Sequence, residues 1–252
     1  MSERKKVLVF TAKWIGLKCI EHLLTRFPQD QYVFVVMEPD ADLITRYLGE
    51  HGQPCFPLSQ ATLDSLHQQY ADGHFDFLLN LWGGHIFKTT TLAKAQHSLN
   101  IHPAYLPYCR GRDPIVWAIR YGWPAGVTLH QIAAGVDEGP IIHREEVPYT
   151  FPITGAALYE QVAARAWQVF CEQWPRLRST AWSAIDQPVL PDNRTFRRED
   201  LLRDRVLDTQ TQPEALDLVR RLLAHDFGDY AAILQHEGKR YSLHCSLQEL
   251  PE

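Results

Sequence analysis

The sequence predicts an α/β fold, with a Rossmann-like, mostly parallel sheet and a small C-terminal α+β extension. Segments with strand periodicity and helix periodicity alternate from the start of the chain, the order that βαβ crossovers require. The strand segments are continuously apolar, as expected for a parallel sheet covered on both faces. With 252 residues, of which 45% are hydrophobic and 22% charged, the chain can form one large core and a smaller appendage.

The first elements follow from their apolar spacing. A largely apolar run predicts a strand over 5–11, and apolar residues at helical spacing predict a helix over 14–27, which Pro28 ends. The pattern then repeats as a strand over 32–37, a helix over 41–51, a short strand over 54–58, a helix over 61–70 and a strand over 75–81. No glycine-rich dinucleotide fingerprint follows the first strand, so NAD is not expected.

The second half of the chain has a different character. We expect a strand ending at Pro103, a helix over 114–121, strands over 126–132 and 141–148, and a long amphipathic helix over 154–174 with Thr154 as its N-cap. Residues 175–194 are irregular and proline-spotted and predict a linker, and a helix over 213–224 and two strands split by Gly238 follow. We therefore expect an N-terminal catalytic domain over 1–180 and a small C-terminal extension, a helix plus a β-hairpin, over 181–252.

Composition narrows the class of function. The formal net charge is -5 and charges of both signs are mixed, so no nucleic-acid partner is expected. The five cysteines are widely separated, without a Cys-x-x-Cys pair, and predict reduced thiols rather than zinc. The start of the chain lacks a signal peptide or membrane span, so we expect a cytoplasmic protein with no membrane partner.

Two polar residues alternate where the strand before Pro103 ends. Asn100 and His102 therefore point to the same face. A carboxamide can donate to a developing oxyanion, and an imidazole exchanges protons near neutral pH, a combination suited to acyl transfer to an amine. Asp137, in a glycine-flanked turn between two predicted strands, is the candidate carboxylate partner.

Other interpretations of these residues remain open on pattern alone. An Asn and a His at a strand end are more often structural than catalytic, and an Asp near glycines is common in turns. His102, His130 and His143 lack metal-ligand spacing, so no metal is expected. Cys109 as a thiol nucleophile is a weaker alternative, because Pro107 separates it from His102.

Four motifs carry a resemblance to a known family. They are Ser98-Leu99-Asn100-Ile101-His102-Pro103-Ala104-Tyr105-Leu106-Pro107, Arg110-Gly111-Arg112-Asp113-Pro114, Gly126-Val127-Thr128-Leu129-His130 and Gly135-Val136-Asp137-Glu138-Gly139-Pro140-Ile141-Ile142. In this order, over roughly 75–150, the chain resembles the folate-dependent formyltransferases, which include glycinamide ribonucleotide, methionyl-tRNA and nucleotide-sugar enzymes. The family's catalytic Asn, His and Asp fall on Asn100, His102 and Asp137.

The resemblance implies 10-formyltetrahydrofolate as the formyl donor and no metal. Asn100 and His102 would stabilise the oxyanion, His102 or a water would carry the amine proton, and Asp137 would orient His102. The residues expected to bind the donor are Leu81, Trp82, Gly83, Gly84, His85, Ile86, Gly135 and Val136. Val136, Glu138 and the segment 82–85 depart from the common family pattern, which bears on the pocket rather than on the reaction.

The acceptor is predicted from the C-terminal part of the chain. Segments at 195–198, 220–232 and 238–241 are similar to the tail of nucleotide-sugar N-formyltransferases, which implies a nucleotide-linked amino dideoxysugar, a role in surface polysaccharide or O-antigen biosynthesis, and a homodimer. The residues expected to contact this substrate are Tyr105, Arg110, Gly111, Arg112, Phe227 and Tyr230.

Several other functions stay open. Hydroxyornithine or glycinamide ribonucleotide could be the acceptor, and the chain could also be a formate-releasing hydrolase or a non-catalytic folate-binding regulatory module. The nucleotide and the position of the sugar amine cannot be predicted, because a few pocket contacts determine both.

Overall fold

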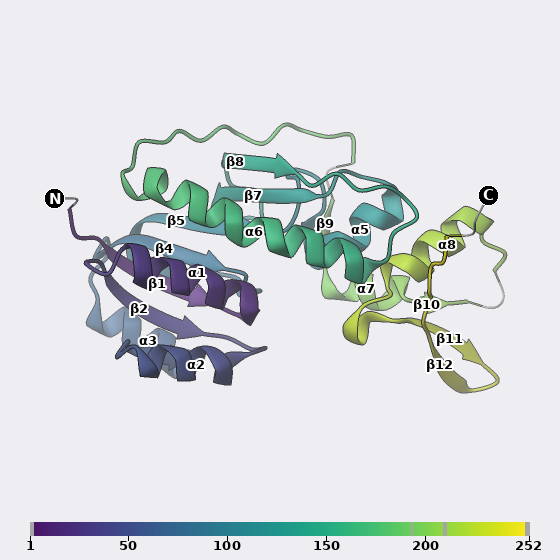
Figure 1. Ribbon diagram of the computed structural model, residues 1–252, viewed down its shortest axis with the longest axis horizontal. Helices are drawn as coiled ribbons and strands as arrows, with labels where there is room; N and C mark the ends of the chain where they lie inside the picture. The colour runs from purple at the N-terminus through teal and green to yellow at the C-terminus, as the bar shows by residue number, and fades with distance from the viewer. Residues whose placement is uncertain (1–2, 193, 209–210, 250–252) are drawn as a thin grey trace. The chain divides into compact units, whose positions relative to one another are not determined.

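The computed structural model describes residues 3–192, 194–208 and 211–249 (Figure 1). The chain divides into two compact units, each described by itself below. Unit 1 comprises Met1–His102, Thr128–His143 and Ala164–Gln187, and unit 2 comprises Pro103–Val127, Arg144–Ala163 and Pro188–Glu252. The domain boundary expected at residue 180 stays a prediction.

The central sheet has seven strands in the order β3-β2-β1-β4-β5-β7-β8. Their bounds are β1 Lys6–Thr11, β2 Gln31–Val36, β3 Cys55–Pro57, β4 Phe75–Leu81, β5 Ala95–His102, β7 Gly126–Gln131 and β8 Ile141–Glu146. β1 pairs in parallel with β2 and β4, β2 with β3, and β4 with β5, whereas β7 runs antiparallel to β5. The prediction of a mostly parallel α/β sheet is confirmed.

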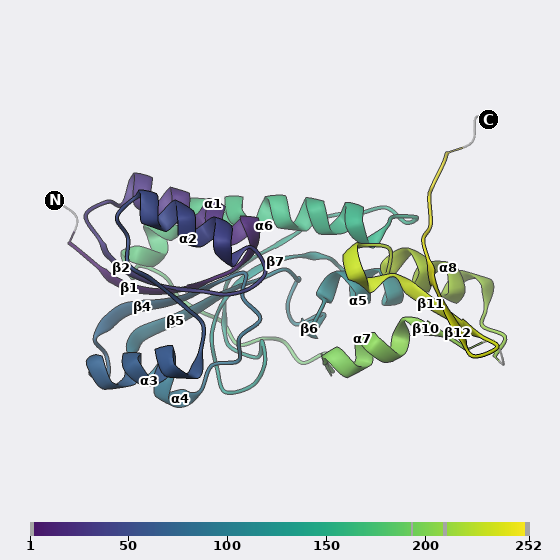
Figure 2. The same cartoon turned by 90° about the horizontal axis from the view of Figure 1, so that it is seen from below.

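Helices cover both faces of the sheet in unit 1. α1 (Lys13–Arg26) and α2 (Ala41–Glu50) lie on one face, and α3 (Gln60–Gln69) and the short α4 (Thr89–Leu92) lie on the other (Figure 2). α3 begins where sequence patterning expects it, since the Ser59 side chain caps it by accepting a hydrogen bond from the Thr62 N–H at 3.1 Å. α4 lies in a segment for which the sequence predicts no element.

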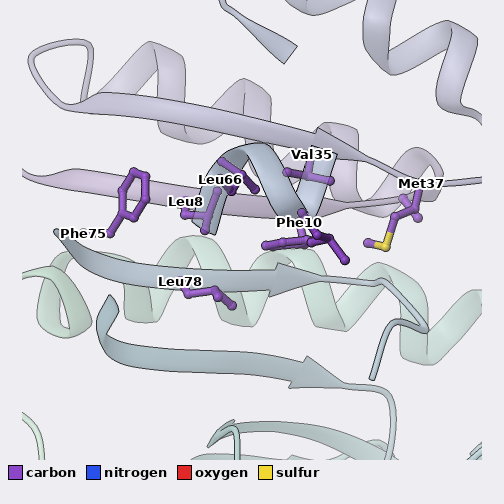
Figure 3. Packing of buried hydrophobic residues seen from close by; sticks show 9 residues of the cluster. Leu8, Phe10, Val35, Met37, Leu66, Phe75 and Leu78 are labelled. Carbon is purple, nitrogen blue, oxygen red and sulfur yellow. The ribbon is translucent and has the colours of Figure 1, made fainter. Parts of the chain in front are cut away.

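The core on the α3 side of the sheet is built from residues of three neighbouring strands. Leu8 and Phe10 of β1, Val35 of β2 and Phe75 and Leu78 of β4 pack with side chains of α3 and with Met37 (Figure 3). Nearly all are less than 5% exposed. At about 25 cal/mol for each Å² of apolar surface removed from water, this packing fixes the strands and thereby the residues at their carboxyl ends.

The long helix α6 (Gly155–Arg178) extends further than its sequence predicts. We expect Pro175 to begin a linker, but Pro175 lies inside the helix, which continues to Arg178. Arg178 and Asp30 form a buried ion pair, with the Arg178 Nε donating to Asp30 Oδ2 at 2.6 Å. This pair holds the last turn in place although Pro175 contributes no N–H. Asn193, in the same predicted linker, lies outside the described residues.

Unit 2 contains the helices α5 (Pro114–Tyr121), α7 (Arg198–Asp204) and α8 (Ala215–Ala224). Its small sheets are β10-β11-β12 (Val206–Leu207, Ala232–His236 and Lys239–Leu243) and β6-β9 (Arg110–Gly111 and Thr195–Phe196). A short 3₁₀ turn covers Gly228–Tyr230. The predicted helix over 213–224 and the hairpin at Gly238 are thus present, whereas α7, β6, β9 and β10 have no counterpart in the sequence prediction.

Candidate active site

Asn100 and His102 lie at the carboxyl end of β5, buried to 9% and 6% exposure. Strand alternation places both on one face, as the sequence predicts. Asp137 lies in the turn between β7 and β8, with its side chain 13% exposed. All three residues belong to unit 1.

The three side chains converge. Asn100 Nδ2 donates to Asp137 Oδ1 at 3.3 Å, and His102 Nδ1 lies 3.5 Å from Asp137 Oδ2. Both distances are long for charge-assisted hydrogen bonds, which usually measure about 2.7–2.9 Å. The Asp137 carboxylate therefore connects the two residues at the end of β5 while leaving them room to contact a reacting group.

The backbone around Asp137 is tightly constrained. Asp137 has a φ of 53°, in the left-handed region that Asp tolerates better than most residues. A Cβ at Gly139 would lie 1.8 Å from the Gln131 carbonyl oxygen, so only glycine fits there. Gln187 Nε2 donates to the carbonyl oxygens of Asp137 and Gly139 at 2.7 and 2.8 Å. Sequence patterning gave no sign of this contact with Gln187, which lies in the predicted linker.

Two more side chains contact Asn100, and neither is among the site residues that the sequence predicts. Asn80 Nδ2 donates to Asn100 Oδ1 at 2.9 Å, and Asn100 Nδ2 lies 3.0 Å from His130 Nε2. The sequence signal that could have identified Asn80 is its place as a polar residue in the otherwise apolar carboxyl end of β4. Its spacing in the sequence raises only a metal-ligand role for His130, although this residue lies in one of the family motifs.

The segment expected to bind the donor follows β4. Leu81 and Trp82 are buried, and Trp82 has a φ of 67°. A Cβ at Gly83 would lie 2.1 Å from Met37 Cε and 2.6 Å from Asn80 Oδ1, so a larger residue would displace these side chains, whereas Gly84 is exposed. Ile86 is 72% exposed, and Val136, beside Gly135 in the Asp137 turn, is 38% exposed. These two side chains offer apolar surface to a ligand.

His85 is held between aromatic rings. It stacks on Phe10 with ring centroids 5.8 Å apart and meets Phe87 edge-on at 4.8 Å. Burial, and to a lesser extent the Lys88 charge, lowers the pKa of His85, so it is neutral near pH 7. A neutral imidazole ring in apolar surroundings suits a flat ligand better than a charged imidazolium ring would.

The residues expected to contact the acceptor all belong to unit 2. Arg112 and Tyr230 line a hollow of about 190 Å³ together with Arg198, Arg205 and Asp229, among others. The lining thus includes three arginines and two acids, because Asp113 also belongs to it and lies 3.3 Å from Arg112 Nε.

The other expected acceptor residues pack within unit 2. Arg110 is buried, and Gly111 pairs with β9 at a φ of 86°. The Arg144 guanidinium lies 4.4 Å from the centre of the Tyr105 ring. Phe227 stacks on Tyr159 at 6.0 Å and is partly exposed, so packing already engages one face of its ring.

The alternative nucleophile lacks the properties it needs. Cys109 is 2% exposed, and burial raises the pKa of its thiol well above the ordinary value. It is therefore protonated at neutral pH and not a competent nucleophile. Within the described ranges, no group of three or more His, Cys, Asp or Glu side chains is placed to hold a metal ion.

None of the described helices is both long and apolar enough to cross a membrane.

Comparison with solved structures supports the fold. The chain is similar to a sugar N-formyltransferase from a Shewanella species, with a TM-score of 0.82 and 19% identity, over 98% of this chain and 99% of that one. It is also similar to an N-formyltransferase from Helicobacter canadensis in complex with folinic acid and dTDP-3-aminofucose. That match has a TM-score of 0.74 and 18% identity and covers 94% of this chain and 85% of the other.

Sequence comparison gives the family. A methionyl-tRNA formyltransferase from Stenotrophomonas maltophilia is 32% identical over 130 residues, which are 51% of this chain and 42% of the relative. The match thus spans less than half of the length of this relative. The family model described as formyl transferase matches residues 29–173, more than half of the chain and the part that carries Asn100, His102 and Asp137. The chain therefore belongs to the formyl transferase family.

Proposed function

We propose that this protein is an N-formyltransferase that moves a formyl group from 10-formyltetrahydrofolate to the amine of a nucleotide-linked amino dideoxysugar. The observation that carries the proposal is the convergence of Asn100, His102 and Asp137 within 3.3 to 3.5 Å at the end of β5, in a chain of the formyl transferase family. The role in surface polysaccharide synthesis belongs to the same proposal.

The side chains suit each step of such a transfer. The acceptor amine bonds to the formyl carbon, and the bond from that carbon to the folate nitrogen breaks. Asn100 and His102 donate hydrogen bonds to the oxygen that gains negative charge. His102, which Asp137 holds and favours in its charged form, supplies a proton to the departing nitrogen, and a water takes the proton that the amine loses.

The residues of unit 1 fit the formyl donor. A flat pterin needs apolar walls and backbone hydrogen bonds, which the exposed Ile86 and Val136 and the main chain of 82–85 can supply. The donor would bring the activated formyl group. The chain's own residues would orient it toward the end of β5 and exclude water.

Two observations favour a nucleotide-linked amino sugar as the acceptor. A solved structure that is similar over nearly the whole chain is a sugar N-formyltransferase, and the Helicobacter canadensis structure holds dTDP-3-aminofucose. In unit 2, Arg112, Arg198 and Arg205 around one hollow suit a diphosphate, because guanidinium groups bind phosphate oxygens bidentately. The sequence relatives act on methionyl-tRNA by name, which makes that acceptor an outcome to test.

The test is turnover of 10-formyltetrahydrofolate with each candidate acceptor. The panel holds dTDP-, GDP- and UDP-linked amino sugars, glycinamide ribonucleotide, hydroxyornithine and methionyl-tRNA, beside the His102→Ala variant. We expect tetrahydrofolate release that depends on an amino sugar and is lost in the variant.

Each other outcome points to a different function. Turnover with methionyl-tRNA alone would replace the proposed acceptor. Formate release without acceptor would indicate a hydrolase. Folate binding without any turnover would indicate a regulatory module.

A further inference from the structure

A row of three polar side chains crosses the otherwise apolar middle of the sheet in unit 1. Asn80 on β4 lies directly opposite Asn100 on β5, and Asn100 lies directly opposite His130 on β7. All three are buried, at 4%, 9% and 2% exposure. Buried polar groups on neighbouring strands can reach one another only where the register aligns them, and here it aligns all three.

A backbone carbonyl fixes one end of the row. Asn80 Nδ2 donates to the Gly83 carbonyl oxygen and to Asn100 Oδ1, both at 2.9 Å. Since a carbonyl oxygen only accepts, the Asn80 atom that faces it must be the amide nitrogen. The Asn100 atom opposite that nitrogen must then be the oxygen.

A second carbonyl fixes the other end. His130 Nδ1 lies 2.8 Å from the Gln131 carbonyl oxygen and must therefore carry a hydrogen. His130 Nε2 lies 3.0 Å from Asn100 Nδ2, which is the donor, so Nε2 must present its lone pair. Nε2 lies 3.5 Å from Asp137 Oδ1, farther than the 3.0 Å to Asn100 Nδ2, so the contact with Asn100 decides its state. The two carbonyls thus permit one orientation of every group between them.

From this row we infer that Asn80 is a positioning residue for formyl transfer. It holds the Asn100 carboxamide so that its amide nitrogen, and not its oxygen, faces His130 and Asp137. One N–H goes to His130, and the other, at the long 3.3 Å from Asp137, is the one that can donate to the reacting formyl oxygen. With Asn100 flipped, a carbonyl oxygen would meet the Asp137 carboxylate and the developing negative charge, which is repulsive. The kinetic part of this inference rests on the proposed function.

Packing alone does not account for Asn80. The other buried residues of β4 are apolar, and Asn80 Oδ1 is buried without a hydrogen-bond partner among the described residues. A buried unpaired oxygen weakens a fold. An apolar side chain of the same size would remove that oxygen, but it would also leave Asn100 Oδ1 and the Gly83 carbonyl without their donor. Asn80→Leu keeps the size of the side chain and removes its donor, so it tests whether that donor orients Asn100.

The first experiment measures kcat, KM and thermal unfolding of Asn80→Leu. We expect kcat to fall by about 10- to 100-fold because Asn100 loses its orientation. The unfolding temperature should fall as well, because Asn100 Oδ1 and the Gly83 carbonyl lose their donor. Thr11→Val is the matched control, because Thr11 Oγ1 on the neighbouring β1 is also buried without a hydrogen-bond partner among the described residues. Its kcat should equal that of the wild type. A folded Asn80→Leu variant with kcat within about twofold of the wild type would overturn the inference.

A second variant tests the donor role by pH. An ionised Asp at position 80 cannot donate to Asn100, whereas its protonated form carries one O–H and can. Burial favours the protonated form, so kcat of Asn80→Asp should rise relative to the wild type as the pH is lowered. A purely structural residue would give parallel pH profiles in both proteins, and parallel profiles would contradict the inference.

Nitrogen NMR of the histidine rings tests the row without any turnover. In the wild type, His130 should carry its hydrogen on Nδ1, and Asn80→Leu should shift the His130 Nε2 and Asn100 amide signals, whereas Thr11→Val should not. A wild-type His130 with its hydrogen on Nε2 would overturn the inference. If no acceptor is formylated, the proposed function fails, and this spectrum still decides whether the row exists.

Discussion

Asp137 combines a strained backbone with the central carboxylate of the site. Its φ of 53° and the hydrogen bond that Gln187 donates to its carbonyl oxygen fix the Asp137 side chain where it reaches both Asn100 and His102. Such conformations cost roughly 1–3 kcal/mol and persist where the surroundings over-determine them. At the scale of single residues, the geometry is therefore built to hold one carboxylate against two partners.

Asp137→Asn tests this carboxylate. The amide keeps the shape and tolerates the left-handed backbone, but it removes the charge that orients His102 and favours its protonated form. We expect kcat to fall by about 100- to 10,000-fold in the formyl-transfer assay. Asp186→Asn, an exposed acid one residue from Gln187, should behave as wild type. Activity above about a tenth of wild type in Asp137→Asn would contradict its role.

At the scale of elements, the turn between β7 and β8 is held by a segment that follows α6. Ile185 bridges to Ile141, and Gln187 then binds two carbonyl oxygens of the turn. Sequence patterning treats this segment as a linker because its contacts lie some 50 residues away along the chain. The segment therefore supports the site although it forms no helix or strand of its own.

Gln187→Leu should loosen that turn. Losing two hydrogen bonds to carbonyl oxygens lets Asp137 drift, and displacements of about 1 Å can lower turnover by up to roughly 100-fold. We expect kcat to fall by about 3- to 30-fold. The loss should stay below the 100-fold limit because the left-handed backbone at Asp137 still restricts the turn. Steady-state kinetics beside Gln168→Leu, an exposed glutamine on α6, checks the expectation. Equal kcat in both variants would show that these hydrogen bonds are dispensable.

The end of α6 depends on the pair of Arg178 with Asp30. Their side chains are 7% and 0% exposed, so Arg178→Met leaves a buried carboxylate without its cation. We expect the free energy of unfolding to drop by about 3–5 kcal/mol in urea denaturation. The double variant Asp30→Leu with Arg178→Met should recover much of that loss. A drop below about 1 kcal/mol in the single variant would contradict the pairing.

At the scale of the whole molecule, each unit carries a different part of the proposed reaction. Unit 1 holds Asn100, His102, Asp137 and residues 81–86, which we propose bind the donor, and unit 2 holds the three arginines that line the hollow. Unit 2 has its own buried charge network, in which Arg120 Nε donates to Asp204 Oδ2 at 2.8 Å and His225 Nε2 lies 2.9 Å from the same oxygen.

That network predicts how stability depends on acid. Burial alone would raise the pKa of Asp204, but hydrogen bonds from His225 and Arg120 outweigh it and lower the pKa from 3.8 to about 2. The pKa of Asp204 is lower in the folded protein than in the unfolded chain. The ionised carboxylate therefore stabilises the fold fully at pH values above the unfolded pKa, and this stabilisation is lost as the pH falls through the folded pKa. It amounts to roughly 2 kcal/mol. Urea unfolding between about pH 5 and pH 2 should show this loss, and Asp204→Asn should have a flatter pH dependence. Equal slopes would contradict the assignment.

The sequence predicts the molecule where its signals are local. Hydrophobic periodicity locates β1 to β4 and α1 to α3 within one or two residues. It misses α7 and the two-residue strands β6, β9 and β10. These strands form through pairing with segments that are distant in the sequence. Pro175 misleads because the pair of Arg178 and Asp30 holds a turn that a proline usually ends.

The same division applies to the site. Motif resemblance locates Asn100, His102 and Asp137, whereas Asn80 joins them only through strand register, which no local pattern specifies. Gln187 is hidden for a similar reason, because its role depends on where a distant segment returns to the sheet.

The most direct test of the central claim follows the formyl group itself. The wild-type protein and His102→Ala are each incubated with isotope-labelled 10-formyltetrahydrofolate and the amino-sugar panel, and the sugar products are analysed by NMR and mass spectrometry. We predict a labelled formamide on the sugar nitrogen with the wild type and none with the variant. Label that ends as free formate, or on methionyl-tRNA when that acceptor is supplied instead, would contradict the assignment of a nucleotide-linked amino sugar as acceptor.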